Sequence, residues 1–459
     1  MSELFDLSQY IEKTFGFRPN RNQCSDLTRL FFEILKREDI SLDRLLEQLR
    51  RNTDCRRVSG RDRFFLIKRA LIARRFPIAS SQEALALGDV FLPKVRPASG
   101  ANPRIPGQFE AQKIFVEPGL LRSALFRRFN AAFPAAQIEE IEHHSLYAKK
   151  NKFDLGQLKQ PLVFIVKESW DYIKPCPCTP GHISCGYWIL NLGFGCPFDC
   201  SYCFLQQYAN FPGLILPANL EDFFDRFSKF EKKLDMPIRI GTGEFCDSLA
   251  LDEITQYSRQ LIPYFSTKKV LFEFKTKSDK IGNILSMPAS SNIVVSWSLN
   301  PPSIVETEEL GTAGLHARLS AAAEVQKKGF SVGFHFDPVI YSSDWREKYQ
   351  EVIDLLYTRL KPPFAWISIG TLRGNRELKV ASEARFPRSA IFYGELLLGK
   401  DKKLRYPAGM RKEIHRIMRE MIRAKDEKTP VYLCMEDKES WKALGRSEPA
   451  DIARYLLGR

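Results

Sequence analysis

The sequence of 459 residues contains no apolar run long enough to cross a bilayer, and no hydrophobic segment of a secretory signal follows Met1. These two absences favour a cytoplasmic protein. In that reducing compartment a disulfide framework is rare, so the ten cysteines are expected to serve metal or redox chemistry. An internal repeat is also absent, which argues against a repeat architecture.

The composition that is present favours a large basic protein. The chain is long enough for two or three domains of roughly 100–200 residues each. A hydrophobic content of 44% and 34 phenylalanines can fill a large core. A net charge of +14 and a pI of about 9.2 favour a polyanionic partner such as DNA or RNA, although an ordinary basic protein has the same balance.

The first 91 residues are predicted to form a mostly helical, basic domain. Apolar residues recur at helical spacing between Leu27 and Leu35 and between Leu42 and Leu49. Ser41 is a suitable cap for the second of these helices. The segment 92–111 is rich in proline and glycine and is predicted to be a linker.

Many of the basic residues gather in this N-terminal domain, where Phe64 and Phe65 lie between them. Such a pattern suits a phosphate backbone with stacked bases, and it equally suits the solvated face of an amphipathic helix. The residues are Arg50, Arg51, Arg56, Arg57, Arg61, Arg63, Lys68, Arg69, Arg74 and Arg75.

From residue 112 onward, strand and helix patterns alternate. Alternation of this kind predicts an α/β fold with a parallel sheet, and about six units predict a partial (β/α)6 barrel over 112–435, followed by a C-terminal helical extension over 436–459. The predicted strands cover 162–166, 188–192, 238–240, 270–274, 293–299, 331–336, 365–369 and 431–434. The predicted helices cover 220–234, 250–264, 279–286, 313–328, 345–360, 410–424 and 448–457.

Three cysteines follow the strand at 188–192 with the spacing C-x3-C-x2-C, namely Cys196, Cys200 and Cys203. A loop this tight can bind one corner of an iron–sulfur cubane, and the missing fourth cysteine would leave one iron open for chemistry. The alternatives are a structural zinc knuckle or scattered buried thiols. Zinc sites usually pair cysteines as C-x2-4-C with a second pair farther on.

The position of this loop, after the first barrel strand, resembles the radical S-adenosylmethionine (SAM) superfamily. The resemblance implies a 4Fe-4S cluster that binds SAM and cleaves it reductively to a 5′-deoxyadenosyl radical. Active sites of such folds lie at the C-terminal ends of the strands.

Polar residues stand at the ends of the following strands. Gly241 and Gly243 allow close backbone approach, and Glu244 suits the SAM amino group, as in the Gly-Glu motif of radical SAM enzymes. Lys277 is the candidate partner of the SAM carboxylate, although Lys275 and Lys277 are equally consistent with a solvated pair. Ser296, Ser298 and Asn300 share one face at the end of the fourth strand and could line a polar pocket there, so Ser298 and Asn300 are candidate cofactor-binding residues. His335 and Asp337 share one face at the end of the fifth strand and could bind a ribose or the substrate, although His335 is more typical of a satisfied core histidine.

A second cysteine group, Cys176, Cys178 and Cys185, has His182 nearby and could bind a metal. The alternative is a redox-active or structural loop. The remaining thiols, Cys24, Cys55 and Cys434, have the appearance of isolated core cysteines.

A longer series of motifs resembles the spore photoproduct lyase family within the radical SAM superfamily, over roughly residues 112–435. The matching residues are Cys203, Phe204, Leu205, Gln206, Thr276, Lys277, Ser298, Leu299, Asn300, Gly311, Thr312, Ala317, Arg318, Leu319, Gly333, Phe334, Pro338, Tyr341 and Trp345. The resemblance implies hydrogen abstraction from a methylene-bridged thymine dimer in damaged DNA, with electrons supplied by a flavodoxin or ferredoxin.

Two positions depart from the family pattern. The family's hydrogen-donating cysteine aligns with Glu244, and the tyrosine after the third cluster cysteine is Phe204. The nearest thiol is Cys246, which would point the same way as Glu244 from an extended backbone, and the nearest phenol is Tyr202. We take both as the candidate catalytic residues. The departures leave two alternatives open: the same radical chemistry on RNA or a small molecule, and a non-enzymatic iron–sulfur protein that binds nucleic acid.

Overall fold

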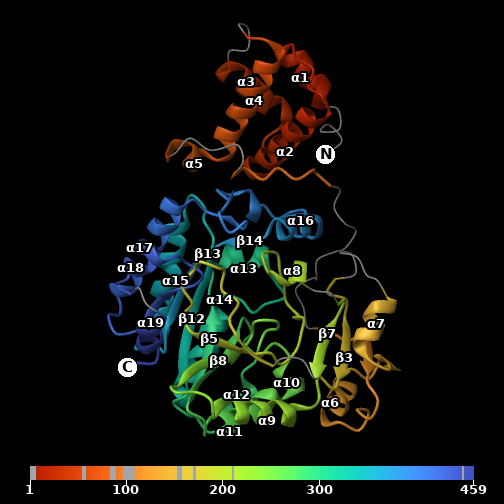
Figure 1. Cartoon of the computed structure of the whole chain (residues 1–459), viewed down its shortest axis with the longest axis vertical. Helices are drawn as coiled ribbons and strands as arrows, with labels where there is room; N and C mark the ends of the chain where they lie inside the picture. Colours follow the sequence, from red (N-terminus) through yellow and green to blue (C-terminus); the bar gives the residue numbers. More distant parts are fainter. Residues whose placement is uncertain are drawn as a thin grey trace. The chain divides into compact units, whose positions relative to one another are not determined.

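The computed structural model describes residues 7–53, 58–82, 89–96, 109–151, 158–168, 172–208, 211–446 and 449–458. The chain divides into two compact units, one made of 1–99 with 373–411 and the other of 100–372 with 412–459. Figure 1 labels their elements. Most of the predicted linker lies outside the described residues, as do Arg56, Arg57 and Cys55.

The first unit contains the predicted N-terminal helices. They are α1 (Leu7–Phe15), α2 (Arg21–Glu38), α3 (Leu42–Asn52), α4 (Gly60–Arg75) and α5 (Pro77–Gln82). Asn20 and Gln23 form a capping box at the start of α2, and the Ser41 side chain accepts a hydrogen bond from the Arg44 amide at the start of α3. Their apolar faces meet in one buried cluster that includes Leu27, Phe31 and Leu45.

Residues 373–411, which the sequence analysis placed inside the barrel, belong to this first unit. They form α16 (Arg376–Arg385) and a small sheet of β14 (Arg373–Gly374), β16 (Leu404–Arg405) and β15 (Leu397–Leu398). A buried ionic cluster joins them to the helices: Glu33 of α2 accepts from Lys379 Nζ at 2.5 Å and from Arg75 Nε at 2.6 Å. The two chain segments therefore share one interior.

The second unit is built on an eight-stranded sheet with the order β17-β13-β12-β10-β9-β8-β5-β4. The strands from β5 to β17 are parallel, and β4 is antiparallel to β5. The strands are β4 (Ile173–Pro175), β5 (Tyr187–Leu190), β8 (Ile238–Thr242), β9 (Val270–Thr276), β10 (Ile293–Ser298), β12 (Ser331–Val339), β13 (Ile367–Thr371) and β17 (Val431–Leu433). The predicted α/β partial barrel with an additional helical region is confirmed.

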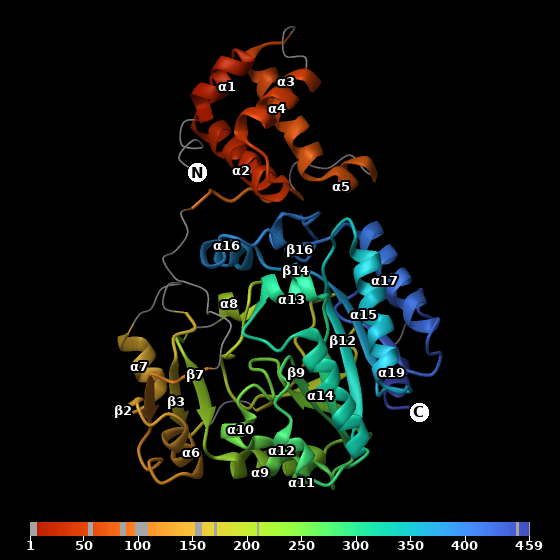
Figure 2. The ribbon, with the colours of Figure 1, turned by 180° about the vertical axis from the view of Figure 1, so that it is seen from behind.

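Helices connect consecutive strands of this sheet, as the alternating pattern predicted. Figure 2 shows α14 and α15 beside β12. The connecting and C-terminal helices are α9 (Leu220–Glu231), α10 (Asp252–Thr255), α11 (Tyr257–Phe265), α12 (Gly282–Leu285), α13 (Pro302–Glu308), α14 (Leu315–Lys328), α15 (Trp345–Arg359), α17 (Ala408–Arg423), α18 (Lys438–Lys442) and α19 (Pro449–Leu456). The sequence analysis did not predict α13 or α16.

A second parallel sheet has the order β2-β1-β3-β7; three of its strands precede the barrel sheet in the chain and β7 follows β5. Its elements are β1 (Lys113–Val116), α6 (Ala124–Ala132), β2 (Gln137–Glu140), α7 (His144–Lys150), β3 (Leu162–Val166) and β7 (Leu214–Pro217). The predicted strand at 162–166 is present, but it belongs to this sheet and not to the barrel. A backbone bridge between Phe194 and Ile215 fixes the approach to the cysteine loop against β7.

Candidate active site

The three predicted cluster cysteines lie on one loop between β5 and α8 (Leu205–Tyr208). Gly195, just before Cys196, has φ +86°, and a Cβ there would lie 2.7 Å from the Gly213 carbonyl oxygen. Lys159 Nζ donates to the carbonyl oxygens of Cys196 and Phe198, both at 2.8 Å. The backbone of the loop is therefore held by contacts that leave its thiols available.

The second half of the loop is fixed by a short antiparallel pair. Strand β6 (Asp199–Cys200) pairs with β11 (Glu309–Leu310), with Cys200 opposite Glu309. Gln206 Nε2 donates to the Cys200 carbonyl oxygen at 3.0 Å and to Asp199 Oδ1 at 2.9 Å. The position of Cys200 thus depends on an element that begins more than a hundred residues later.

Cys200 is buried, and Cys196 and Cys203 are half-buried. Burial raises the pKa of Cys196 to about 11, with Lys159 acting in the opposite direction. It also raises the pKa of Cys200 and of Cys203, against the charge of Lys277. Soft thiol donors beside two cations fit an anionic iron–sulfur cluster, whose binding requires the thiolate form.

Beneath this loop, Glu309 is the centre of a buried hydrogen-bond network. It accepts from the Tyr202 hydroxyl, from Asn300 Nδ2 at 2.9 Å and from Arg318 Nη2 at 2.6 Å. Burial opposes the charge on Glu309, but Arg318 and then Lys277 outweigh it and lower the pKa of the carboxyl to about 2. Sequence reasoning missed Glu309, because it carries no motif of its own.

This network determines what Tyr202 and Asn300 can do. The Tyr202 phenol is buried and committed to Glu309. Asn300 also accepts from the Tyr349 hydroxyl at 2.7 Å, so both ends of its amide are engaged. Ser298 is buried as well, and its carbonyl oxygen accepts from Arg318 Nη1 at 2.8 Å. Through Glu309 of β11, which pairs with β6, these residues stabilise the position of the cysteine loop.

The segment after β8, residues 243–248, lines the same hollow as part of the cysteine loop. Gly243 has φ +102°, and a Cβ there would lie 2.9 Å from the Lys275 carbonyl oxygen. Asp247 accepts from Thr276 Oγ1 at 2.6 Å and from the Lys277 amide at 2.7 Å. Ser248 Oγ accepts from the Lys275 amide at 3.0 Å. Asp247 and Ser248 therefore fix this segment to the end of β9, a role that the sequence analysis did not assign.

Glu244 and the two lysines lie at the same edge of the sheet. Burial acts to lower the pKa of Lys275. The negative charges of Asp337, Glu273 and Glu244 outweigh burial, so the pKa of Lys275 is raised. Lys277 lies over the Tyr202 ring, with Nζ 5.9 Å from its centroid. Lys275 is thus surrounded by carboxylates, whereas Lys277 faces the cysteine loop.

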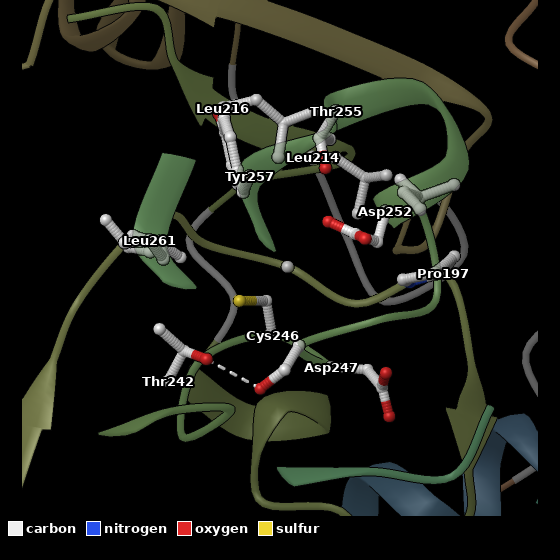
Figure 3. A pocket seen from close by; sticks show the side chains of 14 residues that line it. Pro197, Leu214, Leu216, Thr242, Cys246, Asp247, Asp252, Thr255, Tyr257 and Leu261 are labelled. Carbon is white, nitrogen blue, oxygen red and sulfur yellow. Dashed lines mark hydrogen bonds between the residues drawn. The ribbon is translucent and has the colours of Figure 1, made fainter. Parts of the chain in front are cut away.

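Cys246 does not follow Glu244 on extended backbone, so the premise of the prediction from strand alternation is wrong. Residues 244–246 form a bend instead of extended backbone, after the left-handed Gly243. Cys246 lines a hollow together with Pro197 of the cysteine loop, Leu214 of β7 and Tyr257 of α11 (Figure 3). Burial raises the pKa of Cys246 to about 12, which keeps it as a neutral thiol.

His335 is the satisfied core histidine that its strand position suggested. Its Nε2 lies 2.7 Å from Glu273 Oε1 and its Nδ1 lies 2.6 Å from Ser368 Oγ. Ser296 Oγ donates to the same Glu273 oxygen at 2.6 Å. Burial lowers the pKa of His335, so a neutral ring bridges Ser368 and the carboxylate.

The basic N-terminal residues divide into two groups. Several are bound within the first unit: Arg63 to the Val58 carbonyl oxygen, Lys68 to Asp26, Arg74 to Glu38, Arg75 to Glu33 and Arg51 to Glu47. Helix α4 exposes Arg61, Phe65 and Arg69 on one face at intervals of four residues. Several of the basic side chains are already paired within the first unit. The number of basic residues therefore overestimates the basic surface that a polyanion could contact.

Comparison with known proteins places the chain in a family. Residues 109–383 match the family model described as spore photoproduct lyase. The chain is 24% identical over 264 residues to the spore photoproduct lyase of Bacillus subtilis, covering 56% of this chain and 74% of the relative. It is 24% identical over 201 residues to that of Clostridium acetobutylicum, covering 42% of this chain and 60% of the relative.

Solved structures agree on the fold. A spore photoproduct lyase complexed with dinucleoside spore photoproduct aligns with a TM-score of 0.61 at 20% identity, over 71% of this chain and 99% of that one. A variant of that enzyme with bound AdoMet and dinucleoside spore photoproduct aligns with the same score and coverage. In the part of the chain that the structure describes, no helix is long and apolar enough to cross a membrane. Since the family model matches more than half of the chain, this protein belongs to the spore photoproduct lyase family of radical SAM proteins.

Proposed function

We propose that this protein is a radical SAM lyase that acts on a thymine lesion in DNA, with a 4Fe-4S cluster held by Cys196, Cys200 and Cys203. One observation carries the proposal: three buried or half-buried cysteines lie on one hydrogen-bonded loop at the edge of a parallel sheet, in a chain of this family. When bound, the cluster and SAM supply reductive cleavage of SAM to an adenosyl radical.

The chain's own residues would position SAM at this edge. Gly243, whose positive φ and close packing on Lys275 exclude a side chain, turns the backbone at this edge, and Glu244 next to it offers a carboxylate for the amino group. Lys277 is the better partner for the SAM carboxylate than Lys275, because its charge acts on Cys200 and Cys203 while that of Lys275 is compensated by surrounding carboxylates. Ser298 and Asn300 are assigned the indirect role of supporting the loop.

Cys246 remains the candidate hydrogen-atom donor. A neutral thiol in a hollow that reaches the cysteine loop has the protonation state that this role needs. Tyr202 is better described as a positioning residue, because its hydroxyl is committed to Glu309.

Damaged DNA is the leading substrate. It is supported by the net charge of +14 and by the name and bound dinucleoside of the structural relatives. Glu244, at the position of the family's cysteine, favours a second candidate in which the same chemistry acts on RNA or a small molecule. A flavodoxin or ferredoxin is the proposed electron donor.

The test is thymine recovery from DNA that carries the spore photoproduct. The protein is reconstituted anaerobically with iron and sulfide and is given SAM and a strong reductant. We expect thymine from the unaltered chain, none from Cys200→Ala, and a loss of thymine with Cys246→Ala while SAM is still consumed. SAM cleavage without thymine would refute the lesion and leave the second candidate.

A further inference from the structure

The positive charge of the chain is distributed unevenly between its two units. The first unit contains 29 of the 69 basic side chains and 17 of the 55 acidic ones, so its formal net charge is +12. The second unit is more than twice as long and contains the candidate active site, yet its net charge is only +2. Most of the charge that favours a polyanion therefore belongs to a unit to which the proposed function assigns no role.

This excess of positive charge is present at the surface of the first unit. Among its described residues, fifteen basic side chains are exposed against seven acidic ones. A few of the exposed arginines lie beside carboxylates, such as Arg18 beside Glu12 and Arg51 beside Glu47. The remaining exposed basic side chains still outnumber the acidic ones, so a polyanion can reach a surface of the opposite sign.

Helix α4 gives this charge a defined contact face, formed by Arg61, Phe65 and Arg69. The three side chains are exposed and follow one another at intervals of four residues, so they share one side of the helix. Phe65 is 41% exposed, and its ring lies edge-on to Phe64, with 5.3 Å between the ring centroids. Among the described residues, no hydrogen bond or ion pair engages the guanidinium of Arg61 or Arg69. Both cations are therefore available to a ligand.

A single exposed aromatic ring between two cations favours nucleic acid over a lipid surface. In the part of the first unit that the structure describes, Phe65 is the one large hydrophobic side chain that is exposed. A helix that binds a membrane surface needs a continuous apolar face, which one ring does not provide. A ring that protrudes between guanidinium groups instead suits stacking on a base, while the arginines bind the flanking phosphates.

The spacing of the face matches a nucleic-acid strand. Four helical residues rise about 6 Å, so Arg61 and Arg69 stand about 12 Å apart along the axis, with Phe65 midway. At 3.4 Å for each nucleotide of a stacked strand, that span covers about three to four nucleotides. The exposed carboxyl beside the face is Asp62, which accepts from the Ser59 hydroxyl at 2.6 Å. Its one negative charge leaves the face net positive.

We propose that the first unit is a docking module for single-stranded DNA and that Arg61, Phe65 and Arg69 of α4 form its contact face. The two arginines bind phosphates, and Phe65 stacks on a base between them. The choice of DNA over RNA rests on the proposed function, whereas the binding itself needs neither cluster nor SAM. Because the module is tethered to the second unit, bound DNA is held at a high effective concentration for the candidate active site.

The test measures binding of undamaged DNA, so its outcome is independent of the proposed lyase activity. The full-length Cys200→Ala chain is titrated against a fluorescently labelled single-stranded oligonucleotide, and anisotropy is recorded at several salt concentrations. Adding Arg61→Gln with Arg69→Gln should weaken binding and reduce the slope of log K against log salt by about 1.4, since each phosphate contact contributes about 0.7. Adding Phe65→Ala should weaken binding about fivefold or more and leave the slope unchanged.

The matched control removes the same charge from the second unit. It is Arg346→Gln with Arg416→Gln, two exposed arginines bound to Glu413 and Glu420, and it should leave DNA affinity and salt slope unchanged. Equal losses in the two double variants would overturn the proposal, because binding would then follow total charge.

Other polyanions give further outcomes that would overturn it. Tighter binding of RNA of the same sequence would contradict the choice of DNA. Binding to phosphatidylglycerol vesicles that Phe65→Ala abolishes, with DNA binding unaffected by that change, would assign the face to a lipid surface instead. Since the altered side chains are exposed, each variant should keep the circular dichroism spectrum of the Cys200→Ala chain, and the comparison then reports on contacts and not on folding.

Discussion

Replacing Glu309 by glutamine tests the support of the cysteine loop. The substitution keeps a side chain of the same shape and an oxygen that can accept from Tyr202, but it leaves Arg318 without its buried countercharge. The neighbouring charges lower the pKa of Glu309 from 4.5 to about 2. Since each pH unit of such a difference corresponds to about 1.4 kcal/mol, the interaction stabilises the folded state by about 3 kcal/mol.

The assay is urea unfolding of the reconstituted variant, with its iron content measured in parallel. We expect Glu309→Gln to lose about 3 kcal/mol of unfolding free energy and to bind less iron, because β11 positions Cys200. The exposed Glu306→Gln is the matched control and should change stability by less than about 0.5 kcal/mol. Equal stability and iron content in the two variants would refute the reasoning.

The same interaction predicts a pH dependence. A carboxyl whose folded-state pKa is lowered contributes stability that is present above the unfolded pKa, here about 4.5, and is lost as the pH falls toward about 2. The stability difference between the unaltered chain and Glu309→Gln should therefore shrink below pH 4.5. A difference that stays constant from pH 7 to pH 3 would contradict the assignment.

Three further substitutions probe the two units. Gly243→Ala should destabilise the fold by about 1–3 kcal/mol in urea unfolding, because a left-handed residue must then carry a Cβ, whereas Gly314→Ala should be nearly neutral. Lys277→Met should weaken SAM binding about tenfold or more in equilibrium dialysis, since a charge-assisted hydrogen bond contributes about 1.5–3 kcal/mol, and unchanged affinity would remove Lys277 from the site. Glu33→Gln should cost about 3–5 kcal/mol, because Arg75 and Lys379 would lose their buried countercharge, and a loss below about 1 kcal/mol would contradict this.

The barrel could be predicted because its strands carry strong local signals. Strand β10 is buried at every position and β9 at most of them, so their apolar runs stand out between helices with caps and polar faces. The cysteine loop was equally visible, because its spacing is a local property. Residues 373–411 gave no such signal, since what joins them to the N-terminal helices is a contact between Glu33 and Lys379, far apart in sequence.

The finer geometry of the site depended on contacts that the sequence does not display. Strand alternation predicted a common direction for Glu244 and Cys246, but the positive φ of Gly243 interrupts it. Asn300 was assigned to the cofactor because of its place at a strand end, and its amide is taken by Glu309 and Tyr349.

The most direct test of the account is formation of 5′-deoxyadenosine. The anaerobically reconstituted protein is incubated with SAM and dithionite, and the product is measured by chromatography against Cys200→Ala and Cys24→Ala. The account predicts reductive, SAM-dependent product from the unaltered chain and from Cys24→Ala, and none above background from Cys200→Ala. A cluster-loaded protein that binds DNA but never forms 5′-deoxyadenosine would contradict it and would make the cluster structural.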